Sequence, residues 1–286
     1  MPGTLVSPDD LASHLGDPVW AVIDCRFDLA DTAWGERAYL DAHIPGSVYA
    51  HLDRDLSGTP TGANGRHPLP EADRLATTFG GWGVDDAVQV VAYDQDSGMY
   101  ASRLWWLLRF MGHDAVAVLD GGWARWVATG GPARSGRESR QARAFASRVR
   151  PRMVAPVGEV TALMGDPGVR LVDARAPERY RGDVEPIDPV AGHIPGAVNH
   201  FYQANLDASG VFLPAAALRA RLAAVLGSVA PDHVVVYCGS GVSACHDLLA
   251  LERAGLHGAR LYAGSWSEWC SDPARPVAAG AEDVVG

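Results

Sequence analysis

Short apolar segments alternate with stretches of helical periodicity along this chain. Residues 169–173 and 234–237 are predominantly apolar and of strand length, whereas residues 218–226 and 243–254 carry apolar positions at i, i+3, i+4 and i+7. The first pattern is typical of a buried strand and the second of a helix that buries one face. Strands that alternate with helices predict an α/β fold in which a parallel sheet is flanked by helices.

The order of motifs in the first half of the chain is repeated in the second half. Asp173 follows Asp24 by 149 residues, and His193 follows His43 by 150 residues. The matching segments are AVIDCR and RLVDAR, AHIPGSV and GHIPGAV, QVVAYD and HVVVYC, and LDGGWARW and YAGSWSEW. This spacing is too long for a solenoid repeat and indicates a duplicated domain.

Two domains and a linker are therefore predicted: residues 1–131, the linker 132–152, and residues 153–286. The linker holds seven arginines and few large apolar residues. A solvated segment that follows the surface is favoured over a nucleic-acid-binding arm, because the linker lacks lysine and a series of aromatic residues for base stacking.

The charge balance and the cysteines limit the function classes. A formal net charge of −10 over 286 residues argues against nucleic acid and anionic membranes as partners. No apolar run is long enough to span a bilayer, and the N-terminus lacks the pattern of a secretory signal. The four cysteines form no CxxC pair and no metal-ligand cluster. No metal site is predicted, and a reducing cytoplasm is the expected compartment.

One cysteine stands where ligands bind in parallel α/β sheets, at the carboxyl end of a strand. Cys238 directly follows the apolar segment 234–237, and a short glycine-rich loop leads from it into the helical segment 243–254. Glycine permits close backbone approach, and the free N–H groups at a helix start can converge on the sulfur. The loop therefore predicts an anion cradle around a reactive thiolate. The cradle residues are Gly239, Ser240, Gly241, Val242 and Ser243.

Two chemistries use a cysteine in such a cradle. A phosphotyrosine-type phosphatase needs an arginine six residues after the cysteine to bind the phosphoryl oxygens. Here that position is Ala244, so phosphoryl transfer is disfavoured. The remaining use is a cysteine that accepts a sulfane sulfur, holds it as a persulfide and passes it on.

Together these motifs resemble the rhodanese family of sulfurtransferases in its two-domain form, over nearly the whole chain. The resemblance rests on the two HIPG motifs, the VVVYCGSGVSA loop, the GGW and GSW segments, and GRHPLP at residues 65–70. It implies two tandem rhodanese-like α/β domains, of which only the second keeps the cysteine. The first domain carries Asp94 at the matching position and is expected to be catalytically silent.

The resemblance also bears on the sulfur donor. Thiosulfate-preferring members carry CRKGVTA in the loop and mercaptopyruvate-preferring members carry CGSGVTA; the CGSGVSA of this chain is closer to the second type. Members of both types bind the substrate anion with an arginine that aligns with Arg179. The second arginine of the mercaptopyruvate type falls on Asp188, so the choice between 3-mercaptopyruvate and thiosulfate stays open.

A serine–histidine–aspartate relay is implied for the mercaptopyruvate type, with Ser240 and His43 at the aligned positions. His43 lies in an HIPG motif, however, and His193 lies in the same motif of the second repeat. A shared structural role in the turn before the next strand is the alternative for both histidines. The charged residues that recur are likewise expected to belong to the framework: Asp24, Arg26, Asp173 and Arg175.

The predicted function is a sulfurtransferase in which the Cys238 thiolate takes sulfur from a small anionic donor and gives it to a thiol, thioredoxin or cyanide. No metal or organic cofactor is expected. The alternative is a non-catalytic persulfide carrier that delivers sulfur to a protein partner. A carrier would load once, whereas an enzyme would turn over with small donors and acceptors.

Overall fold

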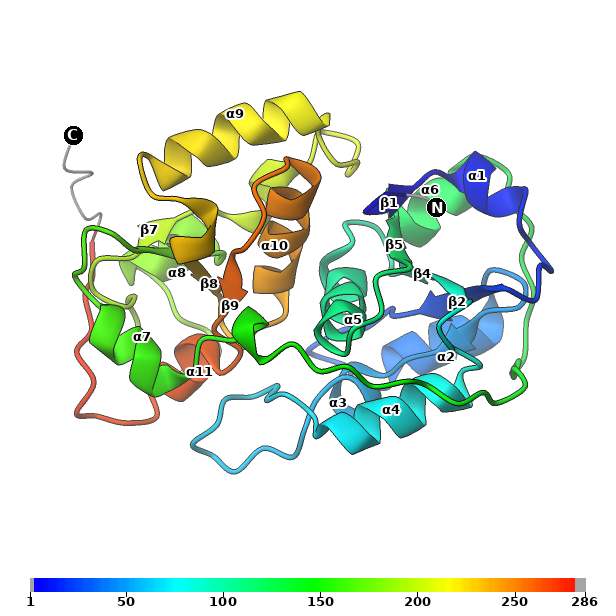
Figure 1. Cartoon of the computed structure of the whole chain (residues 1–286), viewed down its shortest axis with the longest axis horizontal. Helices are drawn as coiled ribbons and strands as arrows, with labels where there is room; N and C mark the ends of the chain where they lie inside the picture. Colours follow the sequence, from blue (N-terminus) through cyan, green and yellow to red (C-terminus); the bar gives the residue numbers. More distant parts are fainter. Residues whose placement is uncertain (1–2, 281–286) are drawn as a thin grey trace. The chain divides into compact units, whose positions relative to one another are not determined.

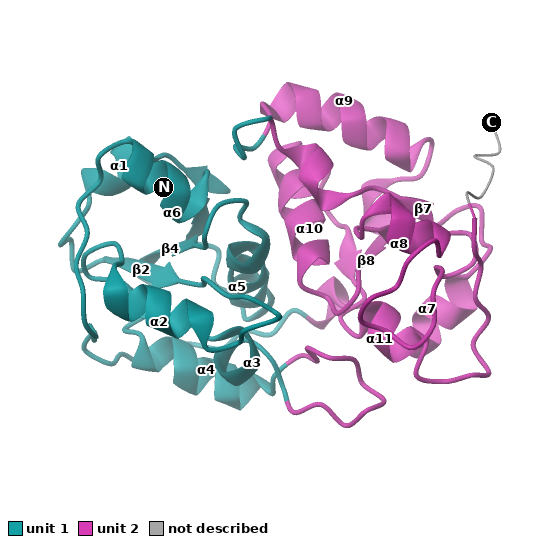
Figure 2. Ribbon diagram, turned by 180° about the vertical axis from the view of Figure 1, so that it is seen from behind, with its two compact units in different colours: residues 1–58, 70–150, 208–212 teal, residues 59–69, 151–207, 213–286 magenta. Residues whose placement is uncertain are grey.

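The computed structural model describes residues 3–280, which form two compact units (Figures 1 and 2). Unit 1 takes the residues up to 58 together with 70–150 and 208–212, and unit 2 takes 59–69, 151–207 and the residues from 213 onward. The units therefore differ from the predicted division in four segments. Residues 59–69 and 151–152 belong to unit 2, and residues 132–150 and 208–212 belong to unit 1.

Unit 1 is a five-stranded parallel sheet flanked by helices, with the strand order β1-β5-β4-β2-β3. Its strands are β1 (Leu5–Val6), β2 (Trp20–Asp24), β3 (Val48–Tyr49), β4 (Gln89–Tyr93) and β5 (Val116–Leu119). Its helices are α1 (Pro8–Ala12), α2 (Trp34–Asp41), α3 (Leu52–Asp55), α4 (Ala72–Gly81), α5 (Met99–Phe110) and α6 (Gly122–Ala128).

Unit 2 repeats this sheet with the strand order β7-β6-β8-β9, again all parallel. A parallel bridge from Val154 to Leu261 stands where β1 joins the sheet of unit 1. The strands of unit 2 are β6 (Arg170–Asp173), β7 (Val198–Asn199), β8 (Val234–Tyr237) and β9 (Arg260–Leu261). Its α-helices are α7 (Val157–Leu163), α8 (Pro177–Arg181), α9 (Ala215–Leu226), α10 (Ser243–Arg253) and α11 (Ser265–Trp269), and its 3₁₀ helices are η1 (Pro151–Met153), η2 (Tyr202–Asn205) and η3 (Pro231–His233).

The predicted α/β class with a parallel sheet in each half is confirmed. The segment 234–237 forms β8, and 169–173 forms β6 from its second residue. The helical pattern of 218–226 lies in α9, which begins earlier, at Ala215. The pattern of 243–254 corresponds to α10, which ends one residue earlier, at Arg253. All four residues of β8 are buried, which explains why its sequence is continuously apolar.

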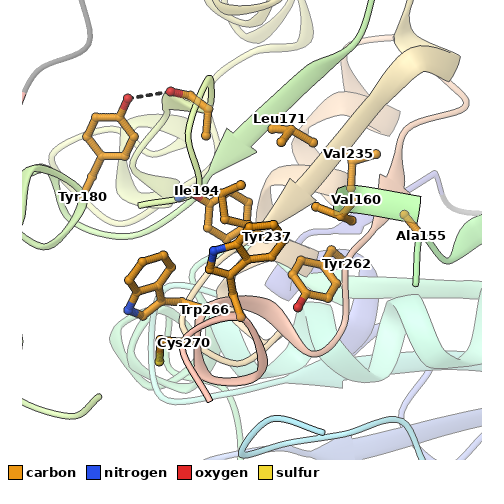
Figure 3. Close-up of a cluster of buried hydrophobic side chains, with 12 residues drawn as sticks. Ala155, Val160, Leu171, Tyr180, Ile194, Val235, Tyr237, Tyr262, Trp266 and Cys270 are labelled. Carbon is orange, nitrogen blue, oxygen red and sulfur yellow. Dashed lines mark hydrogen bonds between the residues drawn. The ribbon is translucent and has the colours of Figure 1, made fainter. Parts of the chain in front are cut away.

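The core of unit 2 packs aromatic side chains against the sheet (Figure 3). Tyr237 of β8 and Tyr262 after β9 lie in one cluster with Trp266 and Trp269 of α11. All four side chains are buried almost completely. Because large aromatic residues dominate the energy of a core, this cluster fixes the strand end from which Cys238 emerges.

A buried aspartate–arginine pair recurs in both units. In unit 1, Arg26 donates to Asp24 across 2.6 Å, and its guanidinium lies 4.7 Å from the Trp123 ring. In unit 2, Arg175 donates to Asp173 across 2.6 Å and lies 4.8 Å from the Trp266 ring. The same contacts in both repeats agree with the interpretation of these residues as framework.

The two HIPG histidines also make equivalent contacts. His43 Nδ1 donates to the Tyr39 carbonyl across 2.7 Å, and His193 Nδ1 donates to the Tyr180 carbonyl across the same distance. Each ring stacks on its tyrosine, with centroids 4.2 Å and 3.8 Å apart. These equivalent contacts agree with a shared structural role of both histidines in the turn before the next strand.

Within residues 3–280, no helix combines the length and the apolar character needed to cross a membrane.

The buried pair leads to a stability prediction. Asp24→Ala leaves the Arg26 guanidinium buried without its carboxylate, so we expect the free energy of unfolding of unit 1 to fall by about 3–5 kcal/mol. Urea titration followed by tryptophan fluorescence measures this loss, since every tryptophan except Trp266 and Trp269 lies in unit 1. Exposed Asp41→Ala is the control and should change stability by about 0.5 kcal/mol or less. Equal losses in the two variants would contradict a framework role for Asp24.

Candidate functional site

The candidate site is built on the loop that joins β8 to α10 in unit 2. Cys238 follows the last residue of β8, and α10 begins at Ser243. We call residues 238–243 the active loop. It contains every residue predicted for the cradle: Gly239, Ser240, Gly241, Val242 and Ser243.

The Cys238 sulfur accepts a main-chain hydrogen bond inside this loop. The Gly241 N–H donates to Sγ across 3.1 Å. Gly241 has φ +76°, and a Cβ on it would lie 2.3 Å from the carbonyl oxygen of Ala263. Only glycine fits this position, because any side chain would meet backbone that cannot move aside. The close packing of Gly241 against the Ala263 carbonyl orients the Gly241 N–H toward the Cys238 sulfur.

The segment after β9 holds the active loop in place. Ser265 Oγ accepts from the Cys238 N–H across 3.1 Å and donates to the Tyr262 carbonyl across 2.9 Å. Trp266 N–H donates to the Cys238 carbonyl, and Ser267 N–H donates to the Gly239 carbonyl. Ser265 has φ +56°, which is costly for a residue with a side chain and persists where surrounding contacts impose it.

A second cysteine fixes the loop from the helix. Cys245 of α10 is fully buried, and its thiol donates to the Gly241 carbonyl across 3.3 Å. Gly241 is thus held through its carbonyl while its N–H points at Cys238.

Ser240 is hydrogen-bonded to a histidine that the sequence comparison did not select. His67 Nδ1 lies 2.7 Å from Ser240 Oγ, and both residues are buried. The prediction of His43 as the relay histidine needs correction, because both ring nitrogens of His43 are engaged inside unit 1, by Tyr39 and Glu138. His67 belongs to GRHPLP, a motif that the resemblance used without giving its histidine a role.

Two guanidinium groups lie beside the active loop. A Cβ on Gly239 would lie 2.9 Å from Arg66 Nη2 and 3.6 Å from Arg179 Nη1. Arg179, which was expected to bind the substrate anion, stands on α8, and its guanidinium lies near Gly239 of the active loop. Arg66 was missed; its place immediately before His67 in GRHPLP is the signal that could have drawn attention to it.

Both arginines are paired with carboxylates of the segment after α8. Arg66 binds Asp188 through a short ion pair, and Arg179 lies 3.4 Å from the same carboxylate and 2.6 Å from Glu185. Burial raises the pKa of Asp188, with Glu185 adding to the rise and the arginines opposing it. The position that departs from the family pattern is therefore occupied by a carboxylate held between two cations.

The corresponding loop of unit 1 contains an anion of its own. Asp94 follows β4, and its carboxylate accepts four main-chain hydrogen bonds of 2.8 to 3.2 Å. The donors are the N–H groups of Asp96, Gly98, Tyr100 and Ala101. Burial outweighs these bonds and raises the pKa of Asp94 to about 6. A strand–loop–helix connection of this kind thus gathers N–H groups around an anion, which in unit 1 is a side chain.

The surroundings distinguish Cys238 from the other thiols. Burial raises the pKa of Cys25, and Asp24 and Asp94 raise it further. Burial also raises the pKa of Cys270, with Asp188 as a second cause. Cys238 has an amide N–H on its sulfur and guanidinium groups near its loop. Such a thiol is suited to nucleophilic attack and to holding a charged adduct.

Comparison with known proteins gives consistent matches. A model of the rhodanese-like domain matches residues 7–129 and again residues 156–272. The probable 3-mercaptopyruvate sulfurtransferase of Pseudomonas aeruginosa is 47% identical over 278 residues, which cover 96% of this chain and 98% of that protein. The putative thiosulfate sulfurtransferase of Mycobacterium tuberculosis is 42% identical over 297 residues, covering 96% of this chain and 97% of that protein.

Solved structures agree with these matches. The 3-mercaptopyruvate sulfurtransferase of Leishmania major superposes with a TM-score of 0.83 at 29% identity, covering 93% of this chain and 74% of that one. The SseA protein of Escherichia coli, a 3-mercaptopyruvate sulfotransferase, superposes with a TM-score of 0.80 at 29% identity, covering 93% of this chain and 99% of that one.

The conformation of Gly241 leads to a prediction about the thiol. Gly241→Ala displaces the amide from the sulfur, so we expect iodoacetamide to alkylate Cys238 at least about tenfold more slowly at pH 7, as the loss of a hydrogen bond to a charged group implies. Gly165→Ala is the matched control: Gly165 has φ +79° with no atom near its Cβ position, so the variant carries the backbone strain without the clash. Similar alkylation rates in the two variants would show that the amide does not activate the thiol.

Proposed function

We propose, on the premise that this chain belongs to the rhodanese family and is a sulfurtransferase, that Cys238 carries the transferred sulfur as a persulfide. The observation that carries the proposal is the Gly241 N–H on Sγ, in a loop that ends a strand and starts a helix. Dipoles fixed in advance stabilise charge without reorganising during the reaction.

The first half-reaction loads the cysteine. The Cys238 thiolate attacks the outer sulfur of the donor and forms an S–S bond. With thiosulfate the original S–S bond breaks, and sulfite leaves with the electron pair. With 3-mercaptopyruvate the C–S bond breaks, and the organic fragment leaves as the enolate of pyruvate, which must gain one proton. Covalent catalysis of this kind divides one difficult transfer into two easier steps.

The second half-reaction returns the enzyme to its starting state. A nucleophilic acceptor attacks the outer sulfur of the persulfide, and the Cys238 thiolate leaves. Cyanide becomes thiocyanate in this step, and a thiol becomes a persulfide. The proposed acceptor in the cell is a thiol or a thioredoxin. All atoms and electrons are accounted for by donor, cysteine and acceptor, so the cycle needs neither a metal nor an organic cofactor.

We favour 3-mercaptopyruvate as the donor and keep thiosulfate as the alternative. The CGSGVSA loop, the relative at 47% identity and the Ser240–His67 hydrogen bond all support this choice. The bond matters chemically, because the enolate of pyruvate needs a proton and sulfite does not. Ser240 and His67 are proposed to deliver that proton.

Arg179 and Arg66 are proposed to bind the donor anion. Both guanidinium groups lie beside Gly239, and an arginine can hold a carboxylate or sulfonate through two hydrogen bonds. Unit 1 is proposed to be catalytically silent, because Asp94 fills the equivalent cradle with a carboxylate. The four cysteines are free thiols, which supports a reducing compartment such as the cytoplasm.

The persulfide is directly measurable. After treatment with either donor and removal of the excess, mass spectrometry should find one added sulfur, about 32 Da, on the peptide that contains Cys238. Cyanide should remove it, and Cys238→Ser should show neither the added mass nor turnover. The peptides containing Cys25, Cys245 and Cys270 are internal controls. Normal turnover with an unmodified Cys238 would contradict the mechanism.

The proposed proton relay predicts that loss of His67 lowers kcat/KM by an amount that depends on the sulfur donor. His67→Gln removes the group that supplies the proton to the enolate, so we expect kcat/KM for 3-mercaptopyruvate to fall about 100-fold. With thiosulfate, whose leaving group needs no proton, the fall should be far smaller. Initial rates with cyanide as acceptor measure both values in one preparation. Equal losses with the two donors would assign His67 a purely structural role.

A further inference from the structure

Asp188 occupies the place in unit 2 where the two loop arginines meet. One of its carboxylate oxygens is paired with Arg66 Nη1, and the other lies 3.4 Å from Arg179 Nη2. Its side chain is 3% exposed, and its N–H donates to Glu185 Oε1 across 3.1 Å. The carboxylate is therefore held firmly between the two cations.

These two cations are also the charged groups closest to Gly239 of the active loop. A donor whose sulfur reaches Cys238 would bring its carboxylate or sulfonate toward the same guanidinium groups. Asp188 already makes the contacts that such a donor would need. The protein thus holds a carboxylate of its own in the position of a competitor.

The charges of this cluster cancel. Arg66, Arg175 and Arg179 carry three positive charges, and Asp173, Glu185 and Asp188 carry three negative charges. An incoming anion therefore meets a neutral cluster in which Asp188 repels it at close range. Repulsion by one fixed charge is twice as large for a dianion as for a monoanion at the same distance.

We propose that Asp188 is a specificity-determining residue, an internal carboxylate that competes with the donor for Arg66 and Arg179 and so selects donors with one negative charge over donors with two. The inference rests on the proposed sulfurtransferase cycle. Of the two donors considered, 3-mercaptopyruvate carries one negative charge at neutral pH and thiosulfate carries two.

Protonation of Asp188 should weaken this selection. Burial raises the pKa of Asp188, and the groups that face it are Arg66, Arg175, Arg179 and Glu185, with Cys270 near by. A raised pKa brings protonation closer to neutral pH. As the pH falls, the neutral acid releases both arginines, and the preference for the monoanionic donor should shrink.

The test compares Asp188→Asn with the wild-type enzyme, using thiosulfate and 3-mercaptopyruvate as donors and cyanide as acceptor. Removing one charge about 6 Å from the donor, at an effective dielectric constant of about 40, changes binding about tenfold per donor charge. We expect kcat/KM to rise about tenfold for 3-mercaptopyruvate and about 100-fold for thiosulfate, mainly through KM. Added salt should reduce both gains.

Asp183→Asn is the matched control, since Asp183 follows α8 five residues earlier and its side chain is 54% exposed. Asp183→Asn should change kcat/KM for either donor by no more than about twofold, because solvent screens the Asp183 charge.

The wild-type pH profile is a second readout that needs no variant. As the pH is lowered from 7.5 toward the pKa of Asp188, the ratio of kcat/KM for thiosulfate to that for 3-mercaptopyruvate should rise, and Asp188→Asn should flatten this rise. A wild-type ratio that does not change with pH would contradict the inference. So would equal gains for both donors in Asp188→Asn, or equal losses, which would make Asp188 an anchor for the arginines. The persulfide on Cys238 is measured independently by mass spectrometry. Failure of the proposed sulfurtransferase cycle can therefore be distinguished from failure of donor selection by Asp188.

Discussion

A main-chain N–H group directed at an anion, at the point where a buried strand turns into a helix, is the interaction on which the candidate chemistry depends. Unit 1 satisfies it with a side chain, since Asp94 accepts four amide hydrogen bonds. Unit 2 places a sulfur there, with the Gly241 amide at 3.1 Å. The Asp94 carboxylate is a permanent part of its loop, whereas the sulfur that Cys238 is proposed to carry can leave. On that proposal, unit 1 holds a fixed anion where unit 2 holds a transferable one.

The rest of each unit keeps this connection rigid. The Asp173–Arg175 pair and Trp266 support the ends of β6 and β8, and Asp24, Arg26 and Trp123 make the matching contacts in unit 1. Buried charges of this kind are tolerated only where each has its partner. Duplication copied the support into both halves, so the recurrence of a residue indicates framework. Chemistry is indicated by the positions at which the repeats differ.

Local sequence could predict the parts of the site that are local. The apolar segment 234–237, the glycines after Cys238 and the helix that follows lie within twenty residues, so strand, cradle and thiol could be predicted together. The Ser240–His67 contact joins residues 173 apart, and the Arg66–Asp188 pair joins residues 122 apart. No local pattern in the sequence indicates that residues 59–69 belong to unit 2. His43 was assigned to the relay through the family resemblance, but its HIPG motif recurs in the second repeat, where His193 makes the equivalent contacts.

The pairing of Asp188 with Arg66 and Arg179 explains how a carboxylate can stand where the mercaptopyruvate type has a second arginine. A carboxylate in an anion-binding site would be unfavourable if it were alone, yet Asp188 has two arginines and an amide contact to Glu185. Both arginines are therefore already paired with carboxylates, Arg66 with Asp188 and Arg179 with Glu185 and Asp188. A donor must replace Asp188 contact for contact. The repulsion between the Asp188 carboxylate and the donor grows with donor charge, and on the proposed selection this dependence is what lets an ion pair discriminate between donors.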